Sequence, residues 1–267
     1  MTHDLQEPVA APDRSPLNRV AVLIPTYNER DTLPLVVARV RAAVPTADVV
    51  ILDDASPDGT GEVADALAEA DAQVTVLHRT AKAGLGAAYL HGFAWALEQG
   101  YDAIVEMDAD GSHPPERLPA MLAAAADADL VIGSRYVRGG RIVNWPLHRK
   151  ALSMGGNAYI KVLLGMPVAD ATAGYRVYRA SALRAIGLTD VASQGYCFQT
   201  DLTLRVVRSG LTVREVPITF TEREVGESKM SRDVMNESLR RITAWGVAHR
   251  TAQVKELLRR EPTWHRL

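Results

Sequence analysis

Two carboxylates stand two positions apart at Asp108 and Asp110, directly after the mostly apolar run 103–107. If that run forms a buried strand, the pair lies where the chain leaves the sheet. Carboxylate oxygens suit Mg²⁺ and Mn²⁺, and these ions keep open coordination positions that phosphate oxygens can fill. The pair therefore predicts a site for a metal ion and a diphosphate. By itself the spacing is also typical of a solvated surface turn, so the prediction depends on its neighbours.

Two further segments carry aromatic and acidic residues after short β-rich runs. The segment 25–29 contains Tyr27, and the segment 53–60 opens with Asp53 and Asp54. An aromatic ring can stack on a nucleobase, and a carboxylate can accept hydrogen bonds from base N–H groups. Together the two segments predict a nucleoside pocket. Tight turns with capping side chains would explain the Asp-Gly pair in the second segment, but they give the tyrosine and the paired carboxylates no role.

The elements that must position these loops follow from the order of apolar runs. Short β-branched runs predict buried strands at 20–24, 49–52, 74–77, 103–107, 130–132 and 211–216. Apolar residues at helical spacing predict helices at 33–44, 60–69, 86–99, 115–126 and 145–165, and a strand-to-helix turn within 175–186. This alternation predicts an α/β fold with a mainly parallel sheet flanked by helices. Ligands of such sheets bind beyond the carboxyl ends of the strands, where the acidic loops stand.

Composition limits the classes of partner. Thirty Lys and Arg residues against 32 Asp and Glu residues leave a formal charge of −2, which predicts no broad basic surface for nucleic acid. The single cysteine, Cys197, excludes an internal disulfide, and we expect it to pack in the interior of a cytoplasmic protein. No run reaches the ~20 apolar residues that a membrane-spanning helix requires. Residues 1–18, which contain three prolines, predict a disordered leader outside the fold.

The acidic motifs, in this order, resemble those of the large inverting nucleotide-sugar glycosyltransferase family with the GT-A fold, over residues 18–230. More closely, the chain resembles the dolichol- and polyprenol-phosphate mannose synthases. The segments that carry this closer resemblance are Lys82–Gly86, Asp108–Asp110, His113–Pro115, Gly133–Tyr136 and Gly226–Lys229. The resemblance implies transfer of mannose from GDP-mannose to a polyprenyl phosphate, with inversion to a β-mannosyl phosphate. It also implies Mg²⁺ or Mn²⁺ as cofactor.

Two alternatives accompany this reading. The first is a polyprenyl-phosphate glucosyltransferase that uses UDP-glucose, because carboxylates alone do not distinguish the two donors. The second is a nucleotide-binding module that keeps the fold without turnover. The charged residues retained at Asp108, Asp110, Arg223 and Lys229 argue against the second alternative.

The resemblance also assigns individual residues. The positions that match the nucleotide-sugar site are Pro25, Tyr27, Glu29, Leu52, Asp54, Asp108, Ala109, Asp110, Arg135, Arg223 and Lys229. Asp108 and Asp110 match the metal ligands, and the catalytic set is Asp110, Arg135, Arg223 and Lys229. Arg149 and Lys150 are further candidates for binding the acceptor phosphate, with a solvated surface ion pair as the equal alternative. Ser112 departs from one variant of the family, in which a glutamine is common at this position.

A phosphate acceptor determines what the site must supply. A phosphate monoester is already ionised near neutral pH, so its attack on the sugar needs no dedicated general base. Cations must instead offset the repulsion between the acceptor phosphate and the donor diphosphate. We therefore expect His113 to shape the loop beside the metal pair rather than to act as the catalyst.

The C-terminal residues 231–267 alternate apolar side chains with Arg and Lys in a basic amphipathic pattern. The pattern predicts either helices packed on the core or attachment to an anionic membrane surface. The expected organisation is therefore a leader over 1–18, a GT-A domain over 19–230 and a helical segment over 231–267. We expect a peripheral protein at the cytoplasmic face of a membrane, held there directly or by a separate membrane-anchored partner.

Overall fold

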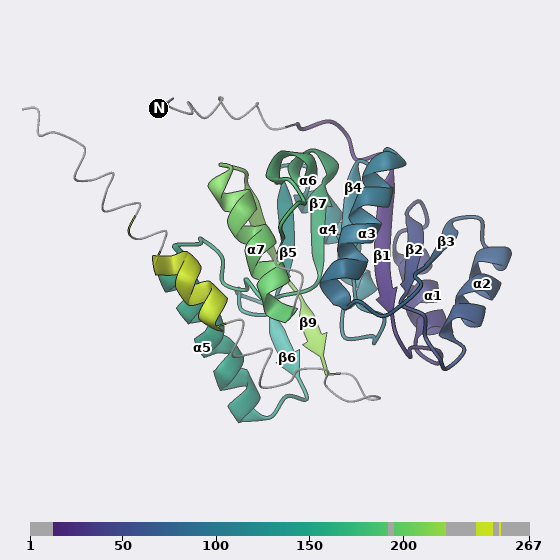
Figure 1. The fold of residues 1–267 in the computed structure, drawn as a ribbon, viewed down its shortest axis with the longest axis horizontal. Coiled ribbons are helices and arrows are strands. Elements are labelled where there is room, and N and C mark those ends of the chain that lie inside the picture. Colours follow the sequence, from purple (N-terminus) through teal and green to yellow (C-terminus); the bar gives the residue numbers. More distant parts are fainter. Residues whose placement is uncertain (1–12, 192–194, 223–238, 248–250, 252–267) are drawn as a thin grey trace, which may run out of the picture.

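The computed structural model describes residues 13–191, 195–222, 239–247 and 251. Its centre is a seven-stranded sheet with the order β3-β2-β1-β4-β7-β5-β8 (Figure 1). The strands are β1 (Val20–Thr26), β2 (Asp48–Asp53), β3 (Val74–His78), β4 (Ala103–Glu106), β5 (Leu130–Ser134), β7 (Arg176–Arg179) and β8 (Val213–Pro217). All neighbours pair in parallel except β7, which runs antiparallel between β4 and β5. The predicted GT-A type of α/β fold is confirmed.

Burial on both faces explains why β1 reads as a continuous apolar run. Ala21 and Leu23 belong to one core cluster, whereas Val22 and Ile24 belong to the other. Successive side chains of a strand point to opposite faces, so a sheet covered on both sides needs apolar residues at every position.

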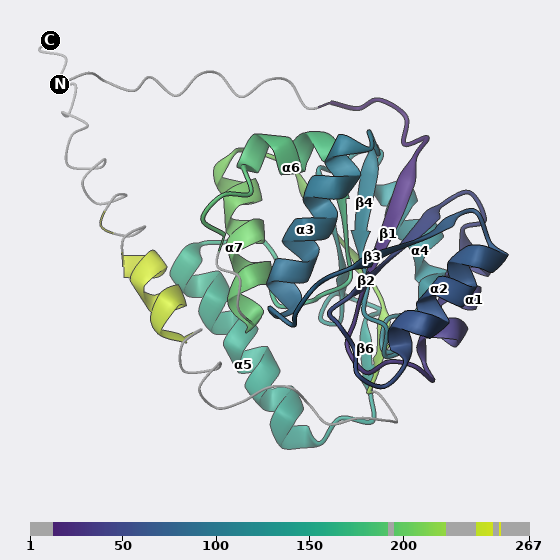
Figure 2. The same cartoon turned by 45° about the vertical axis from the view of Figure 1, so that its right-hand side comes forward.

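Helices cover both faces of the sheet (Figure 2). One face carries α1 (Leu33–Ala43), α2 (Thr60–Ala70) and α4 (Leu118–Ala124), which a short 3₁₀ turn at Pro115–Arg117 precedes. The other face carries α3 (Leu85–Glu98), α6 (Ala180–Ile186) and α7 (Gly195–Arg208). At the periphery, α5 (Leu147–Leu164) lies beside the helical stretch 239–247, as both figures show. The helices predicted between residues 33 and 165 are therefore present, and each boundary lies within three residues of the prediction.

Three elements were not predicted from the sequence. The strands β6 (Arg141–Val143) and β9 (Thr219–Thr221) pair in parallel as a small second sheet. The third is α7, which carries the buried Cys197 as expected. Its polar residues Gln199, Thr200 and Thr203 are buried along with its apolar ones. A helix that is buried around most of its surface lacks the polar face by which periodicity identifies an amphipathic helix.

The N-terminal residues 13–18 contact the domain, although the predicted leader extended to residue 18. Arg14 donates two hydrogen bonds to the Asp129 carboxylate, at 2.8 and 3.1 Å. Asp129 is almost fully buried, and a buried carboxylate requires a cationic or hydrogen-bonding partner. Among the described residues, Arg14 therefore already contacts the domain, although it lies within the predicted leader.

Some predicted segments lie outside the described residues. They include most of the leader, at 1–12, and most of the C-terminal segment 231–267. Among the helices that the structure describes, none is long and apolar enough to cross a membrane.

Candidate active site

Three parallel strands bring the acidic loops to one edge of the sheet. β1 lies between β2 and β4, so the loops that follow these strands are neighbours. Hydrogen bonds join the first two loops directly. The backbone N–H of Asn28 donates to Oγ of Ser56 at 3.1 Å, and that of Glu29 donates to Oγ1 of Thr60 at 3.0 Å. The residues predicted to form a nucleoside pocket therefore share one surface.

Two basic side chains, those of Lys82 and Arg79, contact residues of these loops. Nζ of Lys82 lies 3.7 Å from the centroid of the Tyr27 ring, and Arg79 forms an ion pair with Asp54. Neither cation was assigned a role from the sequence. Arg79 immediately follows β3, so the rule that ligands bind beyond strand ends would have identified it. The edge therefore combines an aromatic ring and carboxylates with positive charge suited to a phosphate-bearing ligand.

Three other residues predicted at the nucleotide site, Pro25, Leu52 and Glu29, lie under or beside these loops. Pro25 faces Leu52 in the β1–β2 register, and Leu52 is fully buried. The Leu52 side chain therefore shapes the sheet under the loops and is not itself open to a ligand. The Glu29 carboxylate accepts a hydrogen bond from Oγ1 of Thr32 at 2.9 Å, which orients it at the start of α1.

The predicted metal pair stands at the end of β4. Asp108 and Asp110 are half-buried, whereas Ala109 between them packs into the core. The backbone N–H of Asp108 donates to Nδ1 of the buried His113 at 3.1 Å. The backbone N–H of Ser112 donates to Oδ1 of Asp110 at 3.0 Å. His113 therefore shapes this loop, as predicted, and its Nδ1 is an acceptor, which places the proton of the neutral ring on Nε2.

The donor set at Asp108 and Asp110 fits a hard divalent cation. Both residues offer carboxylate oxygens on the accessible edge of an otherwise buried strand end. Within the described residues, no group of three or more His, Cys, Asp and Glu side chains forms a closed metal cage. Two carboxylates suit Mg²⁺ or Mn²⁺, which bind proteins through one or two carboxylates and take their other oxygens from phosphates and water.

A buried carboxylate, Glu106, lies behind the metal pair on β4. Burial raises the pKa of Glu106 to about 8, and the charge of Arg176 and the amide of Gln199 lessen the rise. The Arg176 guanidinium is in turn held by the carbonyl oxygens of Ala171 and Ala173. At neutral pH Glu106 is therefore mainly protonated and adds little negative charge behind the metal pair.

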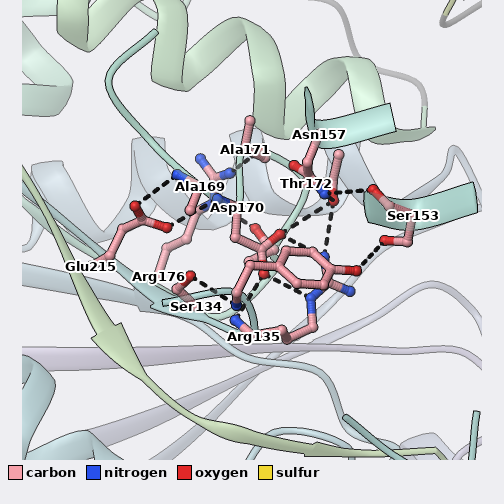
Figure 3. A network of polar contacts seen from close by, with 12 residues as sticks. Ser134, Arg135, Ser153, Asn157, Ala169, Asp170, Ala171, Thr172, Arg176 and Glu215 are labelled. Atoms are coloured by element: carbon pink, nitrogen blue, oxygen red, sulfur yellow. Dashed lines mark hydrogen bonds and ion pairs between the residues drawn. The ribbon is translucent and has the colours of Figure 1, made fainter. Parts of the chain in front are cut away.

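Arg135, predicted beside the substrates, forms the most enclosed ion pair of this edge. It follows β5, which runs in the same direction as β4 because β7 between them is antiparallel to both. Its Nε and Nη2 donate to the two oxygens of Asp170 at 2.8 and 2.7 Å, and its backbone N–H donates to Asp170 at 2.9 Å (Figure 3). The side chains are 6% and 0% exposed. Asp170, which the sequence analysis did not single out, therefore offsets the charge of Arg135.

An aromatic contact connects this ion pair to the metal loop. The Phe220 ring lies edge-on to His113 with centroids 5.8 Å apart, and the Arg135 guanidinium carbon lies 5.5 Å from the Phe220 centroid. The ends of β4 and β5 therefore share one packed environment, although β7 separates the strands.

The two candidates for the acceptor phosphate differ. Arg149 forms an ion pair with Glu222 and lies 4.3 Å from the centroid of the Trp145 ring. Lys150, the next residue of α5, is exposed. For Arg149 the ion-pair alternative is thus present in the structure. Arg223 and Lys229, the basic pair predicted from the family motif, lie outside the described residues.

Two relatives are similar to this chain over most of their length. It is 57% identical to the undecaprenyl-phosphate mannosyltransferase of Micrococcus luteus over 232 residues, which cover 87% of this chain and 96% of that one. It is 54% identical to the polyprenol monophosphomannose synthase of Mycolicibacterium smegmatis over 246 residues, which cover 91% and 93%. The resemblance to polyprenol-phosphate mannose synthases is confirmed.

Solved structures share the fold at low sequence identity. Glucosyl-3-phosphoglycerate synthase from Mycobacterium tuberculosis, in complex with Mn²⁺, UDP and glucosyl-3-phosphoglycerate, superposes with a TM-score of 0.61 at 18% identity, covering 87% of this chain and 80% of that one. The mannosyltransferase PcManGT from Pyrobaculum calidifontis, in complex with GDP-Man and Mn²⁺, gives a TM-score of 0.54 at 19% identity, covering 93% and 68%.

A family model matches the part of the chain that contains both the central strands and the loops at their ends. The model described as glycosyl transferase family 2 matches residues 21–187, more than half of the chain, from the first strand to the end of α6. That range includes the loops after β1 and β2, the carboxylate pair after β4 and the ion-paired arginine after β5. This chain is therefore a glycosyltransferase and belongs to glycosyl transferase family 2.

Proposed function

We propose that this protein transfers mannose from GDP-mannose to a polyprenyl phosphate and forms polyprenyl β-mannosyl phosphate with inversion. The observation that carries this proposal is the identity of 57% and 54%, over about nine-tenths of the chain, to two enzymes named for polyprenyl-phosphate mannosyl transfer. The carboxylate pair at the strand edge supports it, because a nucleotide-sugar donor requires a site for its diphosphate.

On the donor side, Tyr27 and Asp54 would bind the nucleoside, with Lys82 and Arg79 supplying positive charge beside them. Asp108 and Asp110 would hold Mg²⁺ or Mn²⁺. A metal ion bound there would stabilise the negative charge that develops on the departing diphosphate. These residues thus keep the leaving group in place while the sugar is transferred.

On the acceptor side, the proposed nucleophile is an oxygen of the lipid phosphate. It forms a bond to the anomeric carbon on the face opposite the diphosphate, and the bond between that carbon and the diphosphate oxygen breaks to release GDP. No proton has to be removed from an ionised phosphate, which agrees with the loop-shaping position of His113. Arg223 and Lys229, with Lys150 as a further candidate, would offset the charge of the two phosphate groups.

Arg135 has a different part in this proposal from direct phosphate binding. Asp170 accepts three hydrogen bonds from it, so its charge is largely offset within the protein. We assign it as a positioning residue that holds the loop after β5 against α5 and Phe220.

The acceptor also determines where the enzyme works. A polyprenyl chain is insoluble in water, so its phosphate is presented at a membrane surface. We propose that the protein acts there peripherally, at the cytoplasmic face, by its own surface or with a membrane-anchored partner.

Sugar transfer to a short-chain polyprenyl phosphate tests this function. GDP-mannose and UDP-glucose are compared as donors, with Mg²⁺, with Mn²⁺ and with a chelator. We expect mannosyl phosphate lipid from GDP-mannose only in the presence of metal. Transfer from UDP-glucose alone would overturn the donor assignment, and transfer that persists in the chelator would overturn the metal assignment.

A further inference from the structure

The segment 169–173, between α5 and β7 in the sequence, carries the carboxylate that pairs with Arg135. It forms neither helix nor strand, yet Asp170, Ala171 and Ala173 are almost fully buried. A buried irregular segment needs partners for its polar backbone groups, and these partners fix its conformation. The side chains that bind this backbone therefore determine where Asp170 lies.

A carboxylate from β8 binds the start of the segment. The two oxygens of Glu215 accept hydrogen bonds from the backbone N–H groups of Ala169, at 2.7 Å, and Asp170, at 3.0 Å (Figure 3). In the parallel register of β5 and β8, Glu215 is the partner of Ile132, which belongs to the same core cluster as Ala171. The Glu215 side chain therefore points to the face of the sheet on which the segment lies.

A guanidinium group from β7 binds the end of the same segment. Arg176 is fully buried, and its Nη2 and Nε donate to the carbonyl oxygens of Ala171 and Ala173, both at 2.7 Å. Its Nη1 donates to Oγ1 of Thr203 at 2.7 Å and to the carbonyl oxygen of Gln199 at 3.0 Å. The helix α7 thus fixes the guanidinium group in turn.

The signs of these two charges match the direction of the backbone. N–H groups carry partial positive charge and C=O groups partial negative charge, so an anion at the first N–H groups and a cation at the last C=O groups favour the same orientation of the segment. Hydrogen bonds to charged groups are also shorter and stronger than those between neutral groups. Glu215 and Arg176 therefore hold the two ends of the segment in place.

The position of the segment in turn determines the position of Arg135. Asp170 accepts three hydrogen bonds from Arg135, and Oγ1 of Thr172 accepts a fourth at 2.9 Å. Thr172 also accepts a hydrogen bond from Nδ2 of Asn157 on α5, at 3.1 Å. A shift of the segment would therefore move the Arg135 guanidinium and change its contact with α5.

We infer that Glu215 is a positioning residue for sugar transfer. Together with Arg176 it fixes the segment 169–173, and through Asp170 it fixes Arg135 at the strand edge. The effect of Glu215 on transfer rests on the proposed function, whereas its effect on the position of Arg135 does not.

The Nε–H resonance of Arg135 in two-dimensional ¹⁵N–¹H NMR spectra tests the position without any catalysis, and its loss in Arg135→Lys assigns it. Glu215→Gln keeps the size of the side chain but places an NH₂ group, which cannot accept, opposite one of the two backbone N–H groups. In this variant we expect the resonance to shift and its hydrogen to exchange with water at least about tenfold faster. Glu116→Gln, at an exposed glutamate, should change neither.

Kinetics of sugar transfer measure the consequence for the reaction. In Glu215→Gln we expect kcat to fall at least about tenfold, because small displacements of positioned groups are costly to catalysis. The KM for GDP-mannose should change less than about twofold, since the loops after β1 and β2 keep their contacts. Glu215→Asp retains the charge on a shorter side chain, so its kcat and its Arg135 resonance should lie between those of Glu215→Gln and the unmodified chain.

Leu183→Ala is the control for stability. Leu183 is fully buried on α6, which begins beside the amino end of β4, at the edge opposite the site. The variant should lower Tm because it leaves a cavity, and kcat measured well below that Tm should be unchanged.

The outcomes separate this inference from the proposed function. An unchanged Arg135 resonance or an unchanged kcat in Glu215→Gln would overturn the inference. So would a kcat that falls as far in Leu183→Ala, because stability alone would then control turnover. If Glu215→Gln does not fold, the same criteria apply to Glu215→Asp. If the unmodified chain transfers no mannose but the resonance shifts as expected, only the proposed function is contradicted.

Discussion

Replacing Asp170 should lower the free energy of unfolding more than replacing any surface carboxylate. The substitution Asp170→Ala leaves the Arg135 guanidinium, 6% exposed, without its two carboxylate bonds, and leaves the Arg135 backbone N–H without its acceptor. Breaking a buried ion pair from one side costs about 3–5 kcal/mol of unfolding free energy. For a chain of this size, that corresponds to a fall in Tm of roughly 6–20 °C.

Urea unfolding followed by circular dichroism measures this cost, and a double variant tests its cause. In Asp170→Ala/Arg135→Met both charges of this buried pair are removed, so the double variant should be more stable than Asp170→Ala alone. Glu116→Ala is the matched control, because its bidentate ion pair with Arg39 is exposed and should contribute less than about 1 kcal/mol. A cost below about 1 kcal/mol for Asp170→Ala would refute the argument. So would a double variant less stable than Asp170→Ala.

Four further outcomes are expected. Because burial raises the pKa of Glu106 to about 8, the folded chain retains a proton that the unfolded chain releases above about 4.5. The free energy of unfolding should therefore fall as pH rises from about 4.5 to 8, by at most about 1.4 kcal/mol per pH unit. Urea titrations at several pH values measure this dependence, and Glu106→Gln should flatten it. Asp110→Asn should abolish metal-dependent transfer without lowering Tm. The control Asp127→Asn replaces an exposed carboxylate and should leave transfer unchanged. Equal activity of the two variants would contradict the metal assignment. Arg223→Ala should raise the KM for the phosphate acceptor more than tenfold with Tm unchanged, and unaltered acceptor kinetics would remove it from the site. Gly140→Ala should cost about 1–3 kcal/mol in urea unfolding, because the added Cβ would lie 2.7 Å from backbone atoms of the loop after β5; an unchanged midpoint would contradict that steric argument.

The central strands and the position of the carboxylate pair at a strand end could be predicted because their signals are local. The apolar runs of β1, β2 and β4 are short, β-rich and bounded by polar residues, and parallel strands must end at a common edge. The position of Asp108 and Asp110 follows from that rule without any knowledge of distant contacts. His113 could be assigned to the loop for the same reason, since it is five residues from its hydrogen-bond partner.

Other features depended on partners that are far away in the sequence. Asp170 is 35 residues from Arg135, and Arg79 is 25 residues from Asp54. No periodicity or spacing relates such pairs, because only the sheet order brings them together. The helix α7 was missed for a related reason, because burial of its polar residues depends on tertiary contacts such as the hydrogen bond from Arg176 to Thr203.

The sequence by itself determined the alternation of strands and helices, the strand edge that carries the acidic loops, and the family motifs on that edge. These properties are encoded in runs of a few residues, where side-chain size and backbone preference act locally. The tertiary structure alone decided which charges are offset, that Asp170 holds Arg135, and that α5 turns one face to the site. Charge pairing and exposure depend on which segments the fold packs together, and that is a property of the whole chain.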